Sequence, residues 1–599
     1  MSGHAAGAVQ DSPDTLVVLR DRLVQELGSA SHWTGHLSSS ALATAVACFA
    51  LARVDRRGSQ DLIRRGLEWI AAHRNQDGGW GDSPRSPSNL TATLLVWSAL
   101  KAREPRWSFL HDADHAAAQW LTRRLGGLSP ARIVEGIDRR YQSDRTFAAP
   151  ILALCALAGR LGDQAAAWSR VPQLPFEVAV FPPRLYSRLR LTVVSYALPA
   201  LIAVGLVRHR ARPTRSRLLR AVRNRVALRL LAVAARMQPA NGGYEEATPL
   251  TAFVVMCLHA AGYATHEIVL RGLRFLRGAV RKDGSWPIDT NLSTWVTTLS
   301  VRALAECPDS VMTGLPQDAI RSWLLAQQSG TTHPLTFGAP GGWAWTDLPG
   351  GMPDADDTAG TLLALRRLGP IDERTRRAAT LGLNWLLDVQ NSDGGIPTFS
   401  RGWGRLPFDQ SCPDISAHAL QAFAEWQQDT DKRTARRLQR AMRALLRYLT
   451  AAQHPNGAWI PLWFGNQGAR GEQNPVYGTA RVVRALQAAR EVGTPVPDTL
   501  IARGLTCLAQ AQNEDGGWGG AAGVPSTAEE TGLALSALAA ASDRDIVERG
   551  VAWLDRATGY GNRTQPVPIG LYFARLWYSE ELYPVVFAIE GLARVRQSG

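Results

Sequence analysis

The chain has 599 residues, of which 45% are hydrophobic, so it is long and apolar enough for two to four globular domains and is not a disordered protein. Its net charge of +14 favours an anionic partner, either nucleic acid or an acidic lipid surface. Because the sequence has no Lys/Arg-rich recognition motif, zinc-finger spacing or ribonucleoprotein-type motif, we expect no nucleic acid partner and favour a membrane surface.

The six cysteines lie far apart and form no Cys-x-x-Cys pair, which argues against a zinc site and against a disulfide framework. Residues 1–7 are polar, and no basic stretch there leads into an apolar one, so the sequence predicts no secretory signal. We therefore expect an intracellular protein with reduced thiols.

One unit recurs along the chain: an amphipathic helix, a polar turn with Asp or Asn and Gly, an aromatic residue in most copies, and a further helix. Neighbouring copies of the later part are roughly 40 to 60 residues apart, a period typical of stacked helical hairpins. Glycine lets such a turn adopt left-handed backbone angles, and a Gln amide and a Trp ring can bond to the next helix. The turns lie at residues 74–80, 238–244, 282–286, 390–395, 453–459 and 512–518.

The helices before these turns carry apolar residues at i, i+3 and i+4, as in residues 66–73. No run of alternating apolar and polar residues predicts strands, so we expect an all-α fold. The turns are regular after about residue 270 and sparse before it, which indicates two helical barrels. We predict an N-terminal segment, residues 1–25, that packs with the C-terminal barrel, a first barrel of residues 26–268, and a second barrel of residues 269–599.

An apolar region with two possible roles precedes the second barrel. Residues 171–186 are rich in Pro and aromatic residues, and residues 191–207 form an apolar run directly before Arg208. The run is about 17 residues long, at the short limit of a membrane span. Both a buried core helix and a segment that dips into one leaflet remain open. We favour lipid contact for residues 171–186 and core burial for residues 191–207.

Three carboxylates lie within four residues, at Asp354, Asp356 and Asp357, directly before a helix with an apolar face. Carboxylates this close cannot all ionise at low cost in a dry site, so at least one is expected to hold a proton near neutral pH. A buried, protonated Asp is a Brønsted acid. The alternative is that these acids only cap a helix and form a solvated turn.

The aromatic turns and the acid motif together resemble the squalene-hopene cyclase family of class II terpene cyclases. The turns are similar to that family's glutamine-tryptophan repeats, and residues 354–359 are similar to its D-x-D-D-T-A motif. Residues 294–298, 411–418, 459–463 and 477–481 match further motifs in the family's order. The resemblance covers nearly the whole chain. It implies two α/α barrels of the α6/α6 type around a cavity, with no metal and no organic cofactor.

The resemblance assigns Asp356 as the acid that protonates a terminal alkene, with Asp354 and Asp357 holding it and ionising in its place. His418 matches the family histidine that hydrogen-bonds this Asp, and Asp414 lies four residues before it on the same predicted helical face. Because an alkene is a very weak base, we expect a cationic imidazolium to stabilise the carboxylate that is left behind. Without the acid motif, His418 would be interpreted as a core histidine.

After protonation, a carbocation must be steered through ring closures in a water-free cavity. Aromatic faces stabilise cations by roughly 0.5 to 2 kcal/mol each and do not attack them. The turn residues Trp80, Trp286, Trp459 and Trp518 are expected to be structural. By family position, the cavity candidates are Trp295, Trp345, Phe399, Phe408, Trp463, Tyr477, Tyr572 and Phe573.

The favoured function is proton-initiated polycyclisation of squalene to a hopene- or hopanol-type pentacyclic triterpene. The same chemistry on a prenyl diphosphate, an oxidised squalene or a prenylated aromatic remains an alternative. Protein prenyltransferase β subunits have similar barrels, but the spacing of Cys412 and His418 does not match their zinc ligands. A non-enzymatic lipid-binding scaffold with structural acids is the remaining hypothesis.

We expect a monotopic protein on the inner, cytoplasmic face of the cell membrane, held there by anionic lipid. The sequence leaves the oligomeric state open, a homodimer included. His111 and His115 flank two carboxylates at a spacing that metal sites use. On an exposed helix of a basic protein such a group is more often a solvated face, so we predict no metal site there.

Overall fold

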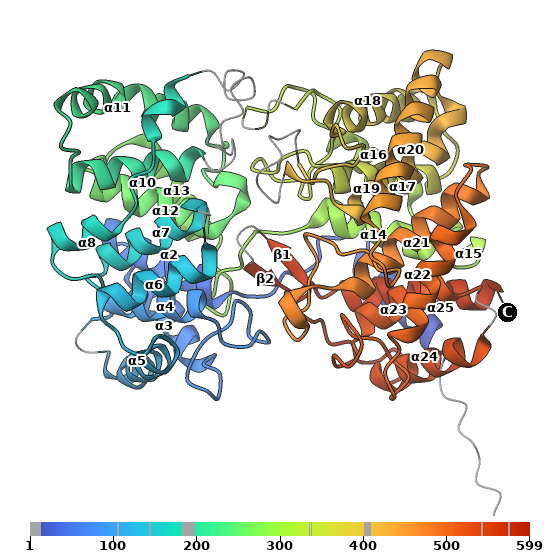
Figure 1. Ribbon diagram of the computed structural model, residues 1–599, viewed down its shortest axis with the longest axis horizontal. Helices are drawn as coiled ribbons and strands as arrows, with labels where there is room; N and C mark the ends of the chain where they lie inside the picture. Colours follow the sequence, from blue (N-terminus) through green and yellow to red (C-terminus); the bar gives the residue numbers. More distant parts are fainter. Residues whose placement is uncertain are drawn as a thin grey trace, which may run out of the picture.

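The computed structural model describes residues 14–104, 107–142, 145–181, 198–334, 336, 338–399, 409–540, 543–572 and 576–598. The chain is mostly helical, which confirms the predicted all-α class, and its helices form two lobes that lie side by side (Figure 1). The first lobe holds the helices from residue 41 to residue 278, and the second holds those from residue 293 onward together with the N-terminal helix α1 (Thr15–Leu27).

Six helices of the second lobe form a closed ring, in which each packs against the next and the last against the first. Apolar and small residues predominate in these helices, so most of their residues are buried, as in α23, where every residue is buried. The ring consists of α14 (Ser293–Ala305), α17 (Ala355–Arg367), α19 (Pro413–Trp426), α21 (Pro475–Glu491), α23 (Ala528–Leu538) and α25 (Tyr583–Ser598). The outer layer consists of α16 (Gln317–Ala326), α18 (Glu373–Val389), α20 (Lys432–Ala452), α22 (Asp498–Gln510), α24 (Arg544–Ala557) and α1 (Thr15–Leu27).

The first lobe repeats this plan. Its inner helices also pack in a closed ring, within the residues that the structure describes: α2 (Ala41–Val54), α4 (Leu90–Ala99), α7 (Arg145–Leu157), α10 (Leu198–Ala211) and α12 (Thr248–Ala260). The outer helices are α3 (Gln60–Ala72), α5 (His111–Leu125), α6 (Pro130–Tyr141), α8 (Gln164–Arg170), α11 (Arg217–Met237) and α13 (Glu267–Gly278). Two α/α barrels therefore form the molecule.

Short elements fill the connections. An antiparallel pair of strands, β1 (Gly570–Tyr572) and β2 (Leu576–Tyr578), lies between the lobes, and Leu37 pairs with Glu580 beside it (Figure 1). The other short elements are α15 (Asp309–Thr313), η1 (Leu100–Ala102), η2 (Ser108–Leu110), η3 (Phe176–Val180), η4 (Tyr244–Glu246), η6 (Gln427–Asp429) and η7 (Arg470–Glu472).

The N-terminal helix α1 contacts the end of the chain. Thr15 Oγ1 donates a hydrogen bond to Asp555 Oδ1 over 2.5 Å, and Arg596 forms an ion pair with Asp14 over 2.6 Å. Helix α1 also packs against α25. The predicted boundary between residues 268 and 269 falls at the start of α13, which packs against α12 and α2. The division into domains stays a prediction.

The turns tie helix to helix through two kinds of hydrogen bond. The Gln side chain of a turn bonds forward, as the sequence predicts: Gln453 Nε2 donates to the carbonyl of Leu500 in the next outer helix over 3.1 Å. The ring N–H of Trp459 bonds backward instead, to the carbonyl of Leu449 over 2.8 Å in the preceding helix. The same backward bond, ten residues long in sequence, recurs at Trp80, Trp286, Trp518 and, through its hydroxyl, Tyr244.

The described residues include two parts of the apolar region before Arg208, residues 171–181 and 198–207. Val171, Leu174 and Phe176 are buried inside the first lobe, so the lipid contact predicted for these residues is wrong, whereas Phe181 is 53% exposed. Residues 198–207 are almost entirely buried in α10, which confirms core burial for the described part of that run. Residues 182–197 lie outside the described residues. Along the part of the chain that the structure describes, no helix combines the length and apolarity needed to cross a bilayer.

Candidate active site

The site residues lie at the N-terminal ends of the ring helices of the second lobe. Asp356 is in the first turn of α17, Tyr477 in the first turn of α21, and Tyr583 begins α25. Trp295 of α14 reaches two of its neighbours: its ring N–H donates to the Tyr583 hydroxyl over 3.0 Å, and its ring meets His418 of α19 edge-on at 6.4 Å. The positive ends of several helix dipoles therefore converge on one site, which favours an anion there.

The three carboxylates of the acid motif have different surroundings. Asp354 caps α17, and its carboxylate accepts the backbone N–H of Asp357 over 2.8 Å. Asp354 and Asp357 are only 3% and 4% exposed, whereas the Asp356 side chain is 21% exposed. Burial raises the pKa of Asp354 to about 7 and the pKa of Asp357 well above its usual range. Near neutral pH the buried pair therefore retains a proton, so at most one of the two carboxyls is ionised, and the role assigned to them of ionising in place of Asp356 stays a prediction.

Asp356 is hydrogen-bonded to His418, as the motif predicts. His418 Nδ1 lies 2.6 Å from Asp356 Oδ1, and on the opposite side of the ring Arg302 Nη1 lies 2.6 Å from His418 Nε2. Burial, and then the charge of Arg302, lower the pKa of His418, against an opposing effect of Asp356. The predicted imidazolium is therefore not favoured, and the fixed positive charge behind the acid belongs to Arg302.

Asp414 lies beside this group but bonds elsewhere. It is buried in the first turn of α19, where its Oδ1 accepts the Cys412 thiol over 2.7 Å. Burial, reinforced by the charge of Asp356, raises the pKa of Asp414 to about 6. Asp414 lines the same small cavity as His418 and Asp356, so the structure brings all five predicted acid and histidine residues together.

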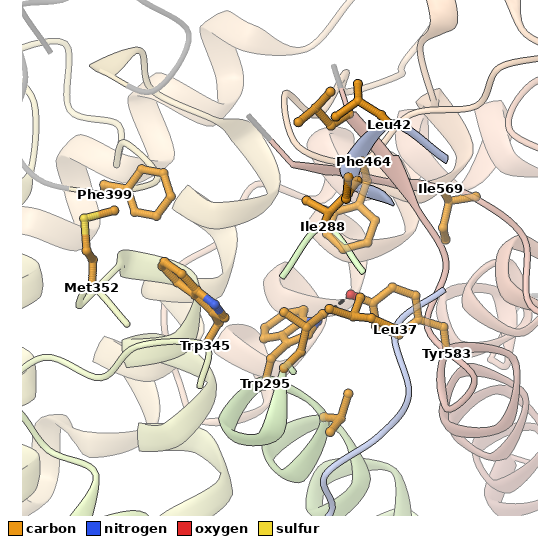
Figure 2. Packing of buried hydrophobic residues seen from close by; sticks show 14 of the residues in the cluster. Leu37, Leu42, Ile288, Trp295, Trp345, Met352, Phe399, Phe464, Ile569 and Tyr583 are labelled. Carbon is orange, nitrogen blue, oxygen red and sulfur yellow. Dashed lines mark hydrogen bonds between the residues drawn. The ribbon is translucent and has the colours of Figure 1, made fainter. Parts of the chain in front are cut away.

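Aromatic side chains form a wall that begins at the acid. Figure 2 shows Phe399, Trp345 and Trp295 following one another, with Tyr583 beyond them. The ring of Phe399 lies edge-on to Trp345 at 6.2 Å and to Trp463 at 5.9 Å. The backbone N–H of Trp295 donates to the carbonyl of Trp345 over 3.2 Å, which ties this wall to the start of α14.

Tyr477 belongs to the same wall. It is 1% exposed, its ring stacks on Phe464 at 4.0 Å, and Phe464 also contacts Tyr583 at 6.0 Å. The predicted aromatic residues Trp295, Trp345, Phe399, Trp463 and Tyr477 thus lie in one connected group. Phe408, Phe573 and the side chain of Tyr572 lie outside the described residues.

Comparison with known proteins shows the family. Residues 17–134 match the squalene-hopene cyclase N-terminal domain and residues 291–597 match the squalene-hopene cyclase C-terminal domain. The chain belongs to the squalene-hopene cyclase family. It is therefore a class II terpene cyclase family member, as the acid motif and the turns predict.

The relatives of this chain are named for different products. The chain is 27% identical to squalene-hopene cyclase of Alicyclobacillus acidocaldarius, over 78% of each protein. It is 25% identical to enfumafungin synthase of Hormonema carpetanum over 91% of this chain, which spans 45% of that longer protein. It is 32% identical to drimenyl diphosphate synthase of Streptomyces showdoensis over 48% of this chain and 46% of that protein.

The fold is similar to that of a solved class II cyclase. The ent-copalyl diphosphate synthase from Streptomyces platensis superposes with a TM-score of 0.60, at 20% identity, over 98% of this chain and 99% of that protein. This likeness shows the shared helical fold of class II terpene cyclases.

Three residues of this squalene-hopene cyclase family site were not predicted: Arg302, Phe464 and Tyr583. Arg302 is the one charged residue in the sequence of α14, seven residues after Trp295 and so on nearly the same helical face, a signal that was open to sequence reasoning. Phe464 directly follows the predicted Trp463. Tyr583 had no local signal, because its contact with Trp295 spans 288 residues.

The pair of histidines at positions 111 and 115 is not part of this site. It lies on outer helix α5 of the first lobe, where Asp114 is paired with Arg103 over 2.8 Å and with Arg160 over 3.1 Å. Among the residues that the structure describes, no group of three His, Cys, Asp or Glu side chains is arranged to hold a metal ion.

Proposed function

We propose that this protein is a proton-initiated cyclase of linear isoprenoids, with Asp356 as the general acid and squalene as the substrate. The observation that carries the proposal is the hydrogen bond of 2.6 Å between Asp356 and His418 at the edge of the aromatic wall. Asp356 is the most exposed carboxyl of the acid motif, whereas Asp354 and Asp357 are buried behind it.

The chemistry follows from the neighbours of the acid. Asp356 transfers its carboxyl proton to the less substituted carbon of the terminal double bond; a C–H bond forms as the π bond breaks, and the positive charge is left on the more substituted carbon. The remaining double bonds then close rings onto that cation, which the faces of Trp295, Trp345 and Phe399 stabilise. The new carboxylate of Asp356 accepts from His418 at the N-terminus of α17, next to Asp357, whose pKa burial raises well above its usual range. Loss of a proton, or addition of water, ends the reaction as a hopene- or hopanol-type pentacyclic product.

The side chains of the aromatic wall favour a hydrocarbon substrate. Leu37, Ile288, Met352 and Ile569 join the aromatic side chains around the site, and all are buried (Figure 2). Asp289 accepts the ring N–H of Trp345 over 3.0 Å, so the charged group nearest to that part of the wall is a carboxylate and not a cation. Such a wall suits squalene better than a diphosphate ester.

A prenyl diphosphate is the second candidate. The 32% identity with drimenyl diphosphate synthase favours it, over about half of the chain. The acid and His418 would perform the same chemistry on either substrate, since the two substrates differ only at the end of the isoprenoid far from the acid.

The test is incubation of the purified protein in detergent with squalene, farnesyl diphosphate or geranylgeranyl diphosphate, followed by gas chromatography and mass spectrometry. Diphosphate products are hydrolysed to alcohols first. Asp356→Asn keeps the shape of the acid but removes its transferable proton, and Asp388→Asn removes a carboxylate that is 60% exposed. We expect pentacyclic products from wild type and Asp388→Asn, and none from Asp356→Asn.

Each other outcome has one meaning. Cyclic alcohols from a diphosphate alone would move the substrate to that class and keep the role of Asp356. Equal turnover by wild type and Asp356→Asn would refute the acid assignment, and a folded wild type that binds isoprenoids without converting any would favour a lipid-binding scaffold.

We also propose that the protein binds the anionic, cytoplasmic face of the cell membrane through α11. This outer helix carries six Arg and no Asp or Glu, and one of the six, Arg223, is paired with Glu177. Leu218 is 77% exposed and Leu228 is 73% exposed on the same helix, among the arginines. Exposed Leu between arginines is typical of helices that lie in a lipid headgroup layer.

Sedimentation with vesicles tests the membrane proposal. We expect binding to phosphatidylglycerol vesicles at low salt, weaker binding at high salt, and little binding to phosphatidylcholine vesicles. The double variant Leu218→Ser/Leu228→Ser should bind less than wild type, while Leu381→Ser, which alters an exposed leucine of the second lobe, should not. A wild type that stays in the supernatant with every vesicle would refute the proposal.

A further inference from the structure

Arg302 contacts His418 from a helix that has no other charged residue. Arg302 is the one charged residue in the sequence of α14, and it points at the family site, where its Nη1 lies 2.6 Å from His418 Nε2. Its other amino group lies 3.5 Å from Gln421 Oε1, and Gln421 in turn donates to Glu425 over 2.9 Å. Burial lowers the pKa of Arg302 to about 10, so the guanidinium keeps its charge at neutral pH.

This contact determines which nitrogen of His418 carries the proton. A guanidinium has only N–H donors and no acceptor, so His418 Nε2 must accept from Arg302. The ring proton of a neutral imidazole is then on Nδ1, and Nδ1–H donates to Asp356 Oδ1 over 2.6 Å. Oδ1 of Asp356 is thereby occupied as an acceptor, which leaves Oδ2 to carry the proton that is transferred.

We propose that Arg302 is a positioning residue that holds His418 as the neutral Nδ1–H tautomer and polarises the hydrogen bond to Asp356. This inference rests on the proposed function, in which Asp356 is the acid. When Asp356 loses its proton, the carboxylate accepts an N–H bond that the guanidinium strengthens through the ring. Arg302 supplies the positive charge without protonation of His418, so this arrangement does not require an acidic pH.

The charges around His418 agree with this role. A cavity of about 20 Å³, room for about one water molecule, is lined by His418, Arg302, Asp414 and Arg481 among others. Arg481 of α21 is paired with Glu590 of α25 over 3.4 Å, Arg484 of α21 is paired with Glu306 over 3.2 Å, and Asp414 accepts the Cys412 thiol, so these three side chains already have partners. On the far side of Gln421, Glu425 is paired with Arg367 of α17 over 2.6 Å, and Tyr477 faces the same cavity.

The test compares Arg302→Leu, which removes the charge, with Arg302→Lys, which keeps it. Arg594→Leu is the control: Arg594 is also largely buried, at 16% exposure, but its contacts are with Glu306, Glu491 and the carbonyl of Ser536. Two properties are measured on the full-length protein. The first is the ¹⁵N NMR spectrum of His418, whose signals are assigned by their loss in His418→Asn. The second is the pH dependence of kcat and KM.

In wild type and Arg594→Leu, we expect His418 to show a protonated Nδ1 and an unprotonated Nε2 at neutral pH. In Arg302→Leu, this preference should be lost and the pKa of His418 should rise, because one of the causes that lower it is removed. At neutral pH, kcat of Arg302→Leu should fall about 10- to 100-fold at an unchanged KM, the effect of one lost hydrogen bond to a charged group. Its kcat should recover on the acid side, where an imidazolium replaces the guanidinium, and Arg302→Lys should restore part of the loss at neutral pH.

The outcomes separate this inference from the proposed function. The ¹⁵N readout needs no turnover, so a wild type that converts no isoprenoid would refute the proposed function while the tautomer is still measured. An unchanged tautomer in a folded Arg302→Leu, or an unchanged kcat, would refute the role of Arg302. A loss of kcat without the change in tautomer and pH profile would also refute it, since that result describes a merely structural residue.

Discussion

Burial of the Asp354 carboxyl lowers the free energy of unfolding of the protein at neutral pH, and a single substitution should remove this loss. Its pKa is about 7 in the folded protein and 3.8 in an ordinary environment. Because this pKa is raised by folding, the folded state binds more protons than the unfolded chain between these values. The stability contribution is therefore fully present below about pH 4 and is lost as pH rises to about 7. At about 1.4 kcal/mol for each pH unit, the loss reaches about 4 kcal/mol, an upper limit because Asp357 shares the proton.

Asp354→Asn should recover much of this loss. Asn is as good an N-cap as Asp, so the bond from the Asp357 backbone N–H to the capping oxygen of α17 is kept. We expect the variant and the wild type to be equally stable near pH 4, and the variant to be more stable by roughly 2 to 4 kcal/mol at pH 8. Urea unfolding of both proteins at several values of pH measures the difference.

The control is Asp388→Asn. The carboxylate of Asp388 is 60% exposed, so its replacement should leave the pH dependence of unfolding unchanged. A stability difference between Asp354→Asn and wild type that stays constant from pH 4 to pH 8 would refute the reasoning, as would a less stable variant at pH 8. Turnover of Asp354→Asn should fall, because Asn cannot share a proton with Asp357. Residues held in an unfavourable environment at the expense of stability are typical of functional sites.

Three further predictions concern the framework around the site. Trp459→Phe removes the hydrogen bond from the ring N–H to the carbonyl of Leu449 and leaves that carbonyl buried. The free energy of unfolding, measured in urea, should fall by roughly 1 to 3 kcal/mol. Trp553→Phe, which changes a partly exposed ring, should lower it less. Gly532→Ala places a methyl group 2.3 Å from the carbonyl oxygen of Phe587, so α23 and α25 must move apart and the midpoint of thermal unfolding should fall clearly. Tyr583→Phe removes the acceptor of the Trp295 ring N–H and should lower kcat or change the product pattern more than it lowers stability, as measured by product analysis beside urea unfolding.

Sequence motifs predicted which residues form the acid group. Asp354, Asp356 and Asp357 lie together in sequence, and the spacing of Asp414 and His418 puts them on one helix, so the group was predictable residue by residue. The sequence also predicted that at least one carboxyl keeps a proton, but not which one. Which carboxyl is dry and which meets the cavity depends on the packing of α17 against α14 and α19, and burial decides whether a carboxyl keeps its proton.

The aromatic wall shows a similar division. Trp345 and Phe399 were predicted from family position, and they do lie in contact. The stacking of Phe464 on Tyr477 was not predictable from a local pattern, because a buried aromatic residue next to Trp463 is equally compatible with the core. The lipid contact expected for Val171 and Phe176 failed for the same reason: an apolar side chain has the same sequence signature whether it is covered by lipid or by protein.

The sequence by itself determined the features that depend on local chemistry: helices from apolar periodicity, turns from Gly, Asn and Asp, and an acid from three crowded carboxylates. Only the tertiary structure decided the features that depend on distant partners. Arg302 meets His418 across 116 residues, and Trp295 meets Tyr583 across 288, because closure of the ring brings helices that are far apart in sequence next to one another. A local pattern specifies which side chains a helix presents, whereas the partner that each side chain meets is set by how the whole chain closes.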